Sequence, residues 1–115
     1  MKIKILCLGT ELVFNQRQVV DDIIQSAVSN LKQETIDVKF SNYKNELELL
    51  HIIKIVNPQL IVLAGIDLST DSTIPIVKIV DPDLLLQKAD DIGKEQIVPL
   101  FRQQVSIIVN ALRRL

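Results

Sequence analysis

The chain has 115 residues, of which 48% are hydrophobic and 23% charged, and this size and composition predict a single folded domain, residues 1–115. Aromatic residues make up only 3%, and 13 basic against 14 acidic side chains leave a formal net charge of −1. These numbers argue against nucleic-acid binding, which uses basic surfaces and aromatic stacking platforms. No apolar run approaches the roughly 18 residues of a membrane span, and a signal-peptide pattern is missing. We therefore expect a soluble, cytoplasmic protein that binds neither nucleic acid nor membranes.

Strand and helix patterns alternate in the amino-terminal half. Residues 3–8 form a short apolar run that ends at Gly9, which is typical of a strand buried on both faces. Residues 17–33 carry apolar side chains at spacings of three and four, which predicts a helix with one buried stripe. That stripe consists of Val20, Ile23, Ile24, Ala27, Val28 and Leu31. Residues 36–43 alternate like a strand near a sheet edge. Residues 44–56 predict a second helix, with a stripe of Leu47, Leu50 and Ile53.

The carboxyl-terminal half begins with the most hydrophobic strand, residues 59–66, which we expect at the centre of the sheet. A polar loop leads to a further strand, residues 74–80. An aspartate–proline pair, a suitable N-cap and first-turn residue, opens a short helix over residues 81–88. A long final helix is predicted over residues 99–115. Its stripe consists of Phe101, Val105, Ile108, Val109, Leu112 and Leu115.

This order of elements predicts an α/β fold, a three-layer α/β/α sandwich around a mostly parallel four-stranded sheet. The last strand follows the central one after a loop too short for a parallel crossover, so we expect it to run antiparallel. In such a sheet, ligands bind beyond the carboxyl ends of the strands. The candidate residues at that edge are Gly9, Thr10, Asn15, Gln16 and Asp67.

This edge carries few groups suited to chemistry. Gly9 stands alone where a dinucleotide-binding loop has three glycines. His51, the only histidine, lies within the second predicted helix, and Cys7, the only cysteine, has the setting of a small buried hydrophobic residue. A Cys/His or Ser/His/Asp arrangement for nucleophilic catalysis is therefore missing. The residues predict no catalytic group, no metal site and no cofactor.

In three segments, residues 3–31, 45–84 and 92–114, the chain resembles the nickel–iron hydrogenase maturation endopeptidases, an α/β family that trims the C-terminal tail of the hydrogenase large subunit. The first segment is similar to the family's opening strand, loop and helix. The second contains the strand "LIVLAGI" with its neighbouring elements, and the third, "IGKEQIVPLFRQQVSIIVNALRR", is a glycine-containing approach to a long last helix. The resemblance implies the same scaffold and a protein partner related to hydrogenases.

The departures from this family fall on its functional positions. Of the family's Gly-x-Gly-Asn motif, Gly9 is kept, whereas Cys7 and Thr10 replace the first glycine and the asparagine. The family's acidic pair, which includes a nickel ligand, falls on Asn15 and Gln16. An amide oxygen is neutral and a much weaker donor to a divalent cation than a carboxylate.

The other two nickel ligands of the family are also missing. The aspartate at the end of the central strand falls on Ala64, although Asp67 is close, and the stretch that carries the histidine ligand is absent. The resemblance therefore implies a scaffold that has lost its nickel site at the degenerate positions Gln16 and Ala64. We expect a non-catalytic binding or assembly protein. The alternative is an active maturation endopeptidase whose altered site still uses nickel.

Two other resemblances stay open. The segment "GTEL", followed by a helix, is similar to molybdopterin-binding domains of the competence-damage type, although their glycine-rich "TGG" turn is replaced by "LAGIDLST". The chain also resembles a pseudo-receiver signalling domain, with Ala64 and Gly65 where a receiver has its phospho-acceptor aspartate. Because a strand and a helix are missing relative to the peptidases, part of the sheet is expected to be uncovered. We expect Val77, Ile79 or the Phe101 side of the final helix to contribute to self-association.

Overall fold

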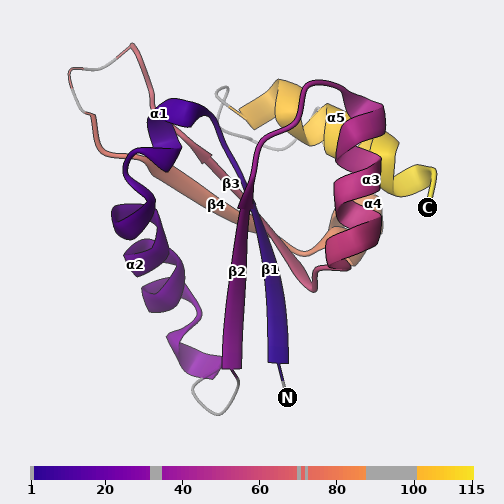
Figure 1. Cartoon of the computed structure of the whole chain (residues 1–115), viewed down its shortest axis with the longest axis horizontal. Helices are drawn as coiled ribbons and strands as arrows, with labels where there is room; N and C mark the ends of the chain where they lie inside the picture. Colours follow the sequence, from indigo (N-terminus) through magenta and orange to yellow (C-terminus); the bar gives the residue numbers. More distant parts are fainter. Residues whose placement is uncertain (1, 32–34, 70, 72, 88–100) are drawn as a thin grey trace.

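The fold is built on a four-stranded mixed sheet with the strand order β2-β1-β3-β4 (Figure 1). A computed structural model of the chain describes residues 2–31, 35–69, 71, 73–87 and 101–115. The strands are β1 (Lys2–Leu8), β2 (Thr35–Ser41), β3 (Leu60–Gly65) and β4 (Ile76–Val80). β1 pairs parallel with both β2 and β3, and β4 pairs antiparallel with β3. The predicted α/β fold is therefore confirmed, including the mostly parallel sheet, the interior position of β3 and the antiparallel last strand.

The chain reaches β2 and β3 by crossovers in opposite directions from β1, and this places the helices on both faces of the sheet. The helices are α1 (Glu11–Phe14), α2 (Arg17–Ala27), α3 (Glu46–Val56), α4 (Pro82–Gln87) and α5 (Arg102–Arg113), with a 3-10 turn, η1, at Ser29–Leu31. In Figure 1, α1 and α2 lie on one side of the strands, and α3, α4 and α5 lie on the other. The complete three-layer sandwich stays a prediction, because residues 88–100 lie outside the described residues.

One face of the sheet, which we call the α3–α5 face, is packed by large aliphatic side chains. Leu6, Leu8, Ile61 and Leu63 of the sheet are buried against residues from α3 and α5. From the helices come Leu49, Leu50, Ile53, Phe101, Val105, Ile108, Val109, Ala111 and Leu112. Phe101 itself has no exposed surface, and a part of this side of the final helix in self-association stays a prediction.

The opposite face, the α1–α2 face, is packed by smaller side chains. Ile5, Cys7, Val62 and Ala64 of the sheet are buried against Val13 of α1 and against Val20, Ile24 and Val28 from α2 and its end. Phe14 of α1 meets Phe40 of β2 edge to face, with ring centroids 5.9 Å apart. The guanidinium of Arg17 stands 4.7 Å from the centroid of the Phe40 ring, a cation–π distance. Val77 and Ile79 of β4 lie half-buried beside this cluster, and their part in self-association stays a prediction.

Several predicted segments differ from the structure in their bounds, conformation or burial. The helix predicted over residues 17–33 ends at Ala27, because β-branched and short polar residues follow and favour other backbone conformations. Residues 11–14, expected as loop, form the single turn α1. The strand predicted over residues 36–43 spans Thr35–Ser41. In α3, Leu47 is 68% exposed, whereas its neighbours Leu49 and Leu50 are buried. Leu115, expected in the final stripe, is 61% exposed.

Side-chain caps fix the starts of two helices. The Oδ1 atom of Asn45 accepts a hydrogen bond of 2.9 Å from the backbone N–H of Glu48 at the start of α3. The Oδ1 atom of Asp81 accepts bonds of 2.9 and 3.3 Å from the backbone N–H groups of Asp83 and Leu84, which confirms Asp81 as the N-cap of α4. α3 ends at Val56, and its C-cap Asn57 has a left-handed φ of 49°, a conformation that asparagine tolerates better than most residues. These caps orient α3 and α4 on their face of the sheet.

Candidate functional site

A crevice of about 260 Å³ opens between the carboxyl ends of β1 and β3. From these two adjacent parallel strands the chain continues in opposite directions across the sheet, to β2 after β1 and to β4 after β3, so the crevice lies where the strand order reverses, the place where α/β sheets bind ligands. Its walls come from the segments that follow the two strands, and Gln104 of α5 contributes to the lining. The residues after the strands are Thr10, Leu12, Ala64, Gly65, Ile66 and Leu68.

Gly9 allows the chain after β1 to lie close to the end of β3. A Cβ atom at this position would stand 3.2 Å from the backbone oxygen of Ala64 and 3.2 Å from Cγ1 of Val13. The backbone of Gly9 is not left-handed, so the glycine is needed here for space. The close approach brings Thr10 and Leu12 to one wall of the crevice and Ala64 to the other.

Two leucines give the crevice an apolar rim that faces solvent. Leu12 of α1 is 58% exposed and Leu68, in the loop after β3, is 83% exposed. This loop is tied to the opposite wall by Gln16, whose Nε2 donates a 2.8 Å hydrogen bond to the backbone oxygen of Thr73. The α1–α2 corner and the β3–β4 loop are therefore held together beside the crevice.

Asp67 stabilises the turn at the base of the β3–β4 loop. Its Oδ1 atom accepts hydrogen bonds from the hydroxyl of Ser69 at 2.6 Å and from the backbone N–H of Ser69 at 3.0 Å. These bonds, that from the hydroxyl first, hold the pKa of Asp67 below its ordinary value. A carboxylate that stays ionised and is engaged by its own loop is suited to shaping the rim, and it is poorly suited to proton transfer near neutral pH.

The polar groups that line the crevice are neutral. Thr10 precedes α1 without capping it through its side chain. The Oε1 atom of Gln104 is buried, and it has no hydrogen-bond partner in the described part of the chain. No lining residue in the described part of the chain has an ionisable side chain. These residues can recognise an uncharged group by shape and hydrogen bonding, and they include no acid, base or thiol.

The structure separates the predicted site residues into two groups. Thr10 and Ala64 line the crevice, and Gly9 and Asp67 lie next to its walls in the chain. Asn15 is an exposed residue at the end of α1. Gln16 follows it and uses its amide N–H to bind the β3–β4 loop. The two positions that the resemblance assigns to nickel ligands thus hold a loop-binding amide and a buried methyl group.

Sequence reasoning missed Leu12 and Gln104. Leu12 belongs to a helix of four residues, too short to show an apolar period. Gln104 did leave a signal, because it lies three residues after Phe101 and four before Ile108. It is thus a polar residue inside the buried stripe of an amphipathic helix.

The described residues offer little for metal or thiol chemistry. Among them, no group of three or more His, Cys, Asp or Glu side chains is arranged to hold a metal ion. Cys7 has no exposed surface, as expected from the sequence. Burial raises the pKa of its thiol to about 12, against a smaller lowering effect of Arg17. Because the thiolate is the reactive form, Cys7 is suited to packing.

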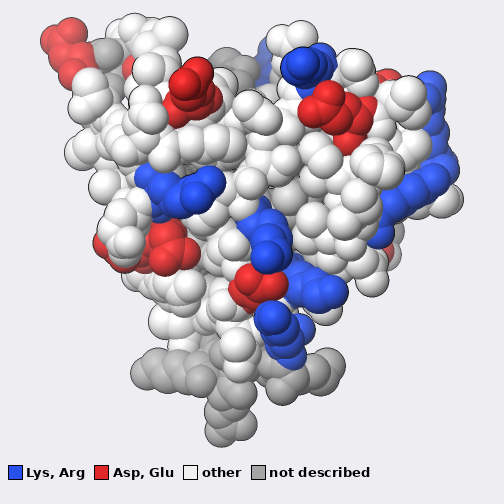
Figure 2. All heavy atoms as spheres, in the orientation of Figure 1, with Lys and Arg blue, Asp and Glu red and all other residues white. Residues whose placement is uncertain are grey.

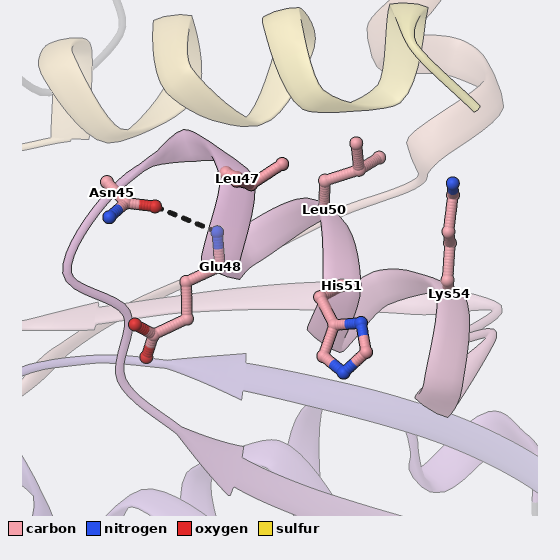
Figure 3. A pocket seen from close by; sticks show the side chains of 6 residues that line it. All are labelled: Asn45, Leu47, Glu48, Leu50, His51 and Lys54. Atoms are coloured by element: carbon pink, nitrogen blue, oxygen red, sulfur yellow. Dashed lines mark hydrogen bonds between the residues drawn. The ribbon is translucent and has the colours of Figure 1, made fainter.

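A second hollow runs along the outer surface of α3 (Figure 3). Its lining includes His51, which is exposed, together with Asn45, Leu47, Glu48, Leu50 and Lys54. Figure 3 shows Glu48 and His51 projecting from one side of the helix and Leu50 from the other. All six residues come from a single helix and the residue that caps it. This hollow is a helix surface, whereas the crevice combines elements that are distant in the sequence and lies between the carboxyl ends of β1 and β3.

Charged side chains of both signs lie on the surface of the molecule (Figure 2). Figure 2 shows acidic and basic side chains interspersed on the face it presents, and one pair, Lys2 and Asp37, has a nitrogen–oxygen distance of 3.6 Å. No helix in the described ranges is long and apolar enough to cross a bilayer. Comparisons with protein-family models, with curated proteins and with solved structures found no match for this chain.

Proposed function

We propose that the protein is a non-catalytic binding or assembly protein that holds a partner protein at the carboxyl edge of its sheet. The observation that carries this proposal is the crevice between β1 and β3, whose lining combines apolar side chains with neutral polar groups. A ligand can be bound there, but none of the described side chains that line it can transfer a proton near neutral pH.

The apolar rim supports a protein as the partner. Leu12, Leu68 and Ile74 are 58%, 83% and 67% exposed and belong to α1 and the β3–β4 loop. Large apolar side chains gathered at one edge are typical of protein interaction sites. The crevice is also smaller than the roughly 300–1,000 Å³ of most cofactor and drug-sized pockets. Its volume therefore favours a side chain of a partner over a pterin.

The resemblance to the hydrogenase maturation endopeptidases supplies the first partner to test, the precursor of a hydrogenase large subunit. In this proposal the chain keeps the scaffold and binds the precursor without cleaving it. The residues at the degenerate ligand positions support the loss of cleavage. Ala64 offers no donor atom, and the side chain of Gln16 is engaged by Thr73.

The test mixes purified protein with a large-subunit precursor and measures complex formation by sedimentation velocity and cleavage by intact mass. We expect a complex in which the precursor keeps its full mass. The double variant Leu12→Ser/Leu68→Ser is expected to weaken the complex at least about tenfold, since each apolar side chain contributes on the order of 1 kcal/mol or more when buried. Leu47→Ser, at a residue 68% exposed on α3, is the matched control and should bind like the wild type.

Three outcomes would contradict parts of this proposal. Loss of the C-terminal tail from the precursor would identify an enzyme. Stoichiometric, micromolar binding of nickel in calorimetry would show that an altered metal site works. The absence of a complex, with both proteins folded, would exclude the hydrogenase precursor as the partner.

A further inference from the structure

We infer that two copies of this chain associate through the outer edge of β2 and join their four-stranded sheets into one continuous sheet. β2 is the outermost strand of the order β2-β1-β3-β4, and within the described part of the chain it pairs only with β1. The backbone N–H and C=O groups on its outer side are therefore open to a further strand. Figure 1 shows the helices to either side of β2, so that a partner can reach this edge.

β2 is regular along its whole length. Its seven residues, Thr35–Ser41, pair one after another with β1 without a bulge, and none of them is a proline. Bulges, prolines and charged side chains are the usual features that stop edge strands from pairing with other chains. β2 carries only the third kind, an aspartate at position 37 and a lysine at position 39. Its charges therefore select a partner strand in which the order of the two signs is reversed.

The sequence of β2 supplies that reversed order itself when two copies run antiparallel with Val38 opposite Val38. Each residue then faces the one equally far from Val38 on the other side, so Asp37 of each copy lies opposite Lys39 of the other. Opposite charges at facing positions stabilise a sheet, as do aromatic–aliphatic pairs and hydroxyl pairs. The remaining facing pairs are of these two kinds: Ile36 with Phe40, and Thr35 with Ser41. A two-fold axis at Val38 thus relates two matching surfaces, as a closed dimer requires.

The side chains that would meet the second copy are accessible in the single chain. Lys39 is exposed and forms no ion pair within the described residues. The side chain of Asp37 is 26% exposed, and its carboxylate lies 3.6 Å from the ammonium of Lys2, which leaves it able to accept a second lysine. On the other face of the strand, Val38 and its two apolar neighbours pack against the α1–α2 cluster but are only half-buried. A second copy would cover this remaining apolar surface and pair the free lysine.

The strand at the other end of the sheet, β4, lacks this complementarity. Its five residues, Ile76–Val80, are centred on Lys78. Antiparallel pairing of two copies of β4 over its full length would set Lys78 opposite Lys78, and like charges at facing positions destabilise a sheet. The complementary charges therefore favour β2 as the edge at which the copies meet.

The first experiment exchanges the charges and measures the mass of the full chain by sedimentation equilibrium. Because one strand per copy makes a small interface, we expect the average mass to rise above the 13.0 kDa of one chain between about 10 µM and 1 mM. Lys39→Asp and Asp37→Lys, each checked for folding by circular dichroism, should weaken the dimer at least about tenfold, because like charges then face each other twice. An equimolar mixture of the two variants should dimerise again, since every lysine then meets an aspartate. Lys78→Asp, the same change on β4, is the matched control.

The second experiment tests the register. In Val38→Cys the two new thiols would lie directly opposite each other, where the distance between Cα atoms is about 4.5–5.5 Å and suits a disulfide. In a glutathione redox buffer we expect a covalent dimer on a non-reducing gel. Cys7 has no exposed surface, so the wild type should stay uncross-linked. Val77→Cys, at a half-buried position of β4, is the control and should also stay uncross-linked.

Four results would overturn the inference: a wild type that stays monomeric at about 1 mM, a dimer that Lys39→Asp leaves intact, a dimer that Lys78→Asp weakens, or cross-linking of Val77→Cys in place of Val38→Cys. The proposed function is judged separately, because no residue of β2 is among the described residues that line the crevice. Binding of the precursor by a monomeric chain would leave the proposed function standing. Dimerisation without precursor binding would leave only the role of β2.

Discussion

The two faces of the sheet are packed by side chains of different size, and this difference separates stability from binding. The α3–α5 face buries leucines, isoleucines and Phe101, most of them with no exposed surface. The α1–α2 face buries valines and the small residues Cys7 and Ala64, and Gly9 lies above it in close contact with Ala64. The larger side chains fill the volume that stabilises the domain. The smaller ones let the segments after β1 and β3 approach each other, and the crevice forms where they meet.

The largest expected effect on stability comes from removing side-chain volume on the α3–α5 face. Phe101→Ala should lower the free energy of unfolding by about 3–5 kcal/mol, because it removes a fully buried ring and leaves a cavity. Urea unfolding followed by circular dichroism measures the change. Leu47→Ala, at a residue 68% exposed on the same face, should change it by about 0.5 kcal/mol or less. Similar losses in both variants would mean that α5 is not packed as described.

The opposite change tests the α1–α2 face, which should be sensitive to added volume. In Gly9→Ala, the new methyl group would lie 3.2 Å from a backbone oxygen and from Val13, and overpacking of this kind costs about 1–3 kcal/mol. That cost outweighs the roughly 0.4–1 kcal/mol that alanine gains by restricting the unfolded chain. Thr10→Ala, at an exposed residue whose side chain makes no cap bond, is the control. A Gly9→Ala variant as stable as the wild type would show that the walls of the crevice can move apart.

The difference between the faces also shows what could be predicted from the sequence. The strands were predictable because buried parallel strands are continuous apolar runs, and the short β3–β4 connection permitted only an antiparallel partner. The burial of α3 was predicted less well. Apolar residues surround most of that helix, so periodicity could not decide between Leu47, which is exposed, and Leu49, which is buried.

The candidate site was predictable in its location and not in its composition. The carboxyl edge follows from strand order alone, and Thr10 and Ala64 do line the crevice there. Gln104 is about 40 residues further along the chain than Ala64, and only the packing of α5 against the sheet brings the two together. The single turn α1 carries Leu12 to the rim, and four residues are too few for a periodic signal. Tertiary packing therefore decides the ligand that the edge can accept.

The unpaired Oε1 atom of Gln104 predicts that this side chain lowers the stability of the fold. Gln104→Met should raise the free energy of unfolding by about 1 kcal/mol, because it replaces an unsatisfied buried acceptor by an apolar group of similar length. Gln103→Met, at an exposed position, should change it by less than about 0.5 kcal/mol. Thermal unfolding of the three proteins under the same conditions measures both effects. A destabilised Gln104→Met would mean that the amide contributes to the stability of the fold.

The smallest effect on stability expected at neutral pH concerns Cys7. Its thiol tests whether the packing of the α1–α2 face excludes water. Burial raises the pKa of its thiol from 9.0 to about 12. A folded-state pKa above the unfolded one means that the thiol contributes stability that is complete below pH about 9 and is lost as the pH rises toward about 12. Burial also raises the pKa of Tyr43, so the wild type alone cannot isolate the thiol.

The informative quantity is the difference between the wild type and Cys7→Ala. Replacing the thiol by a methyl group costs packing energy that does not depend on pH, so the two proteins should differ by a constant amount below pH about 9. Above it the wild type should lose stability faster, and the two curves should converge. Urea midpoints measured at intervals from pH about 7 to pH about 10.5 test this. Parallel curves would show that water reaches the thiol in the folded protein. The small side chains of the α1–α2 face would then not exclude solvent from Cys7.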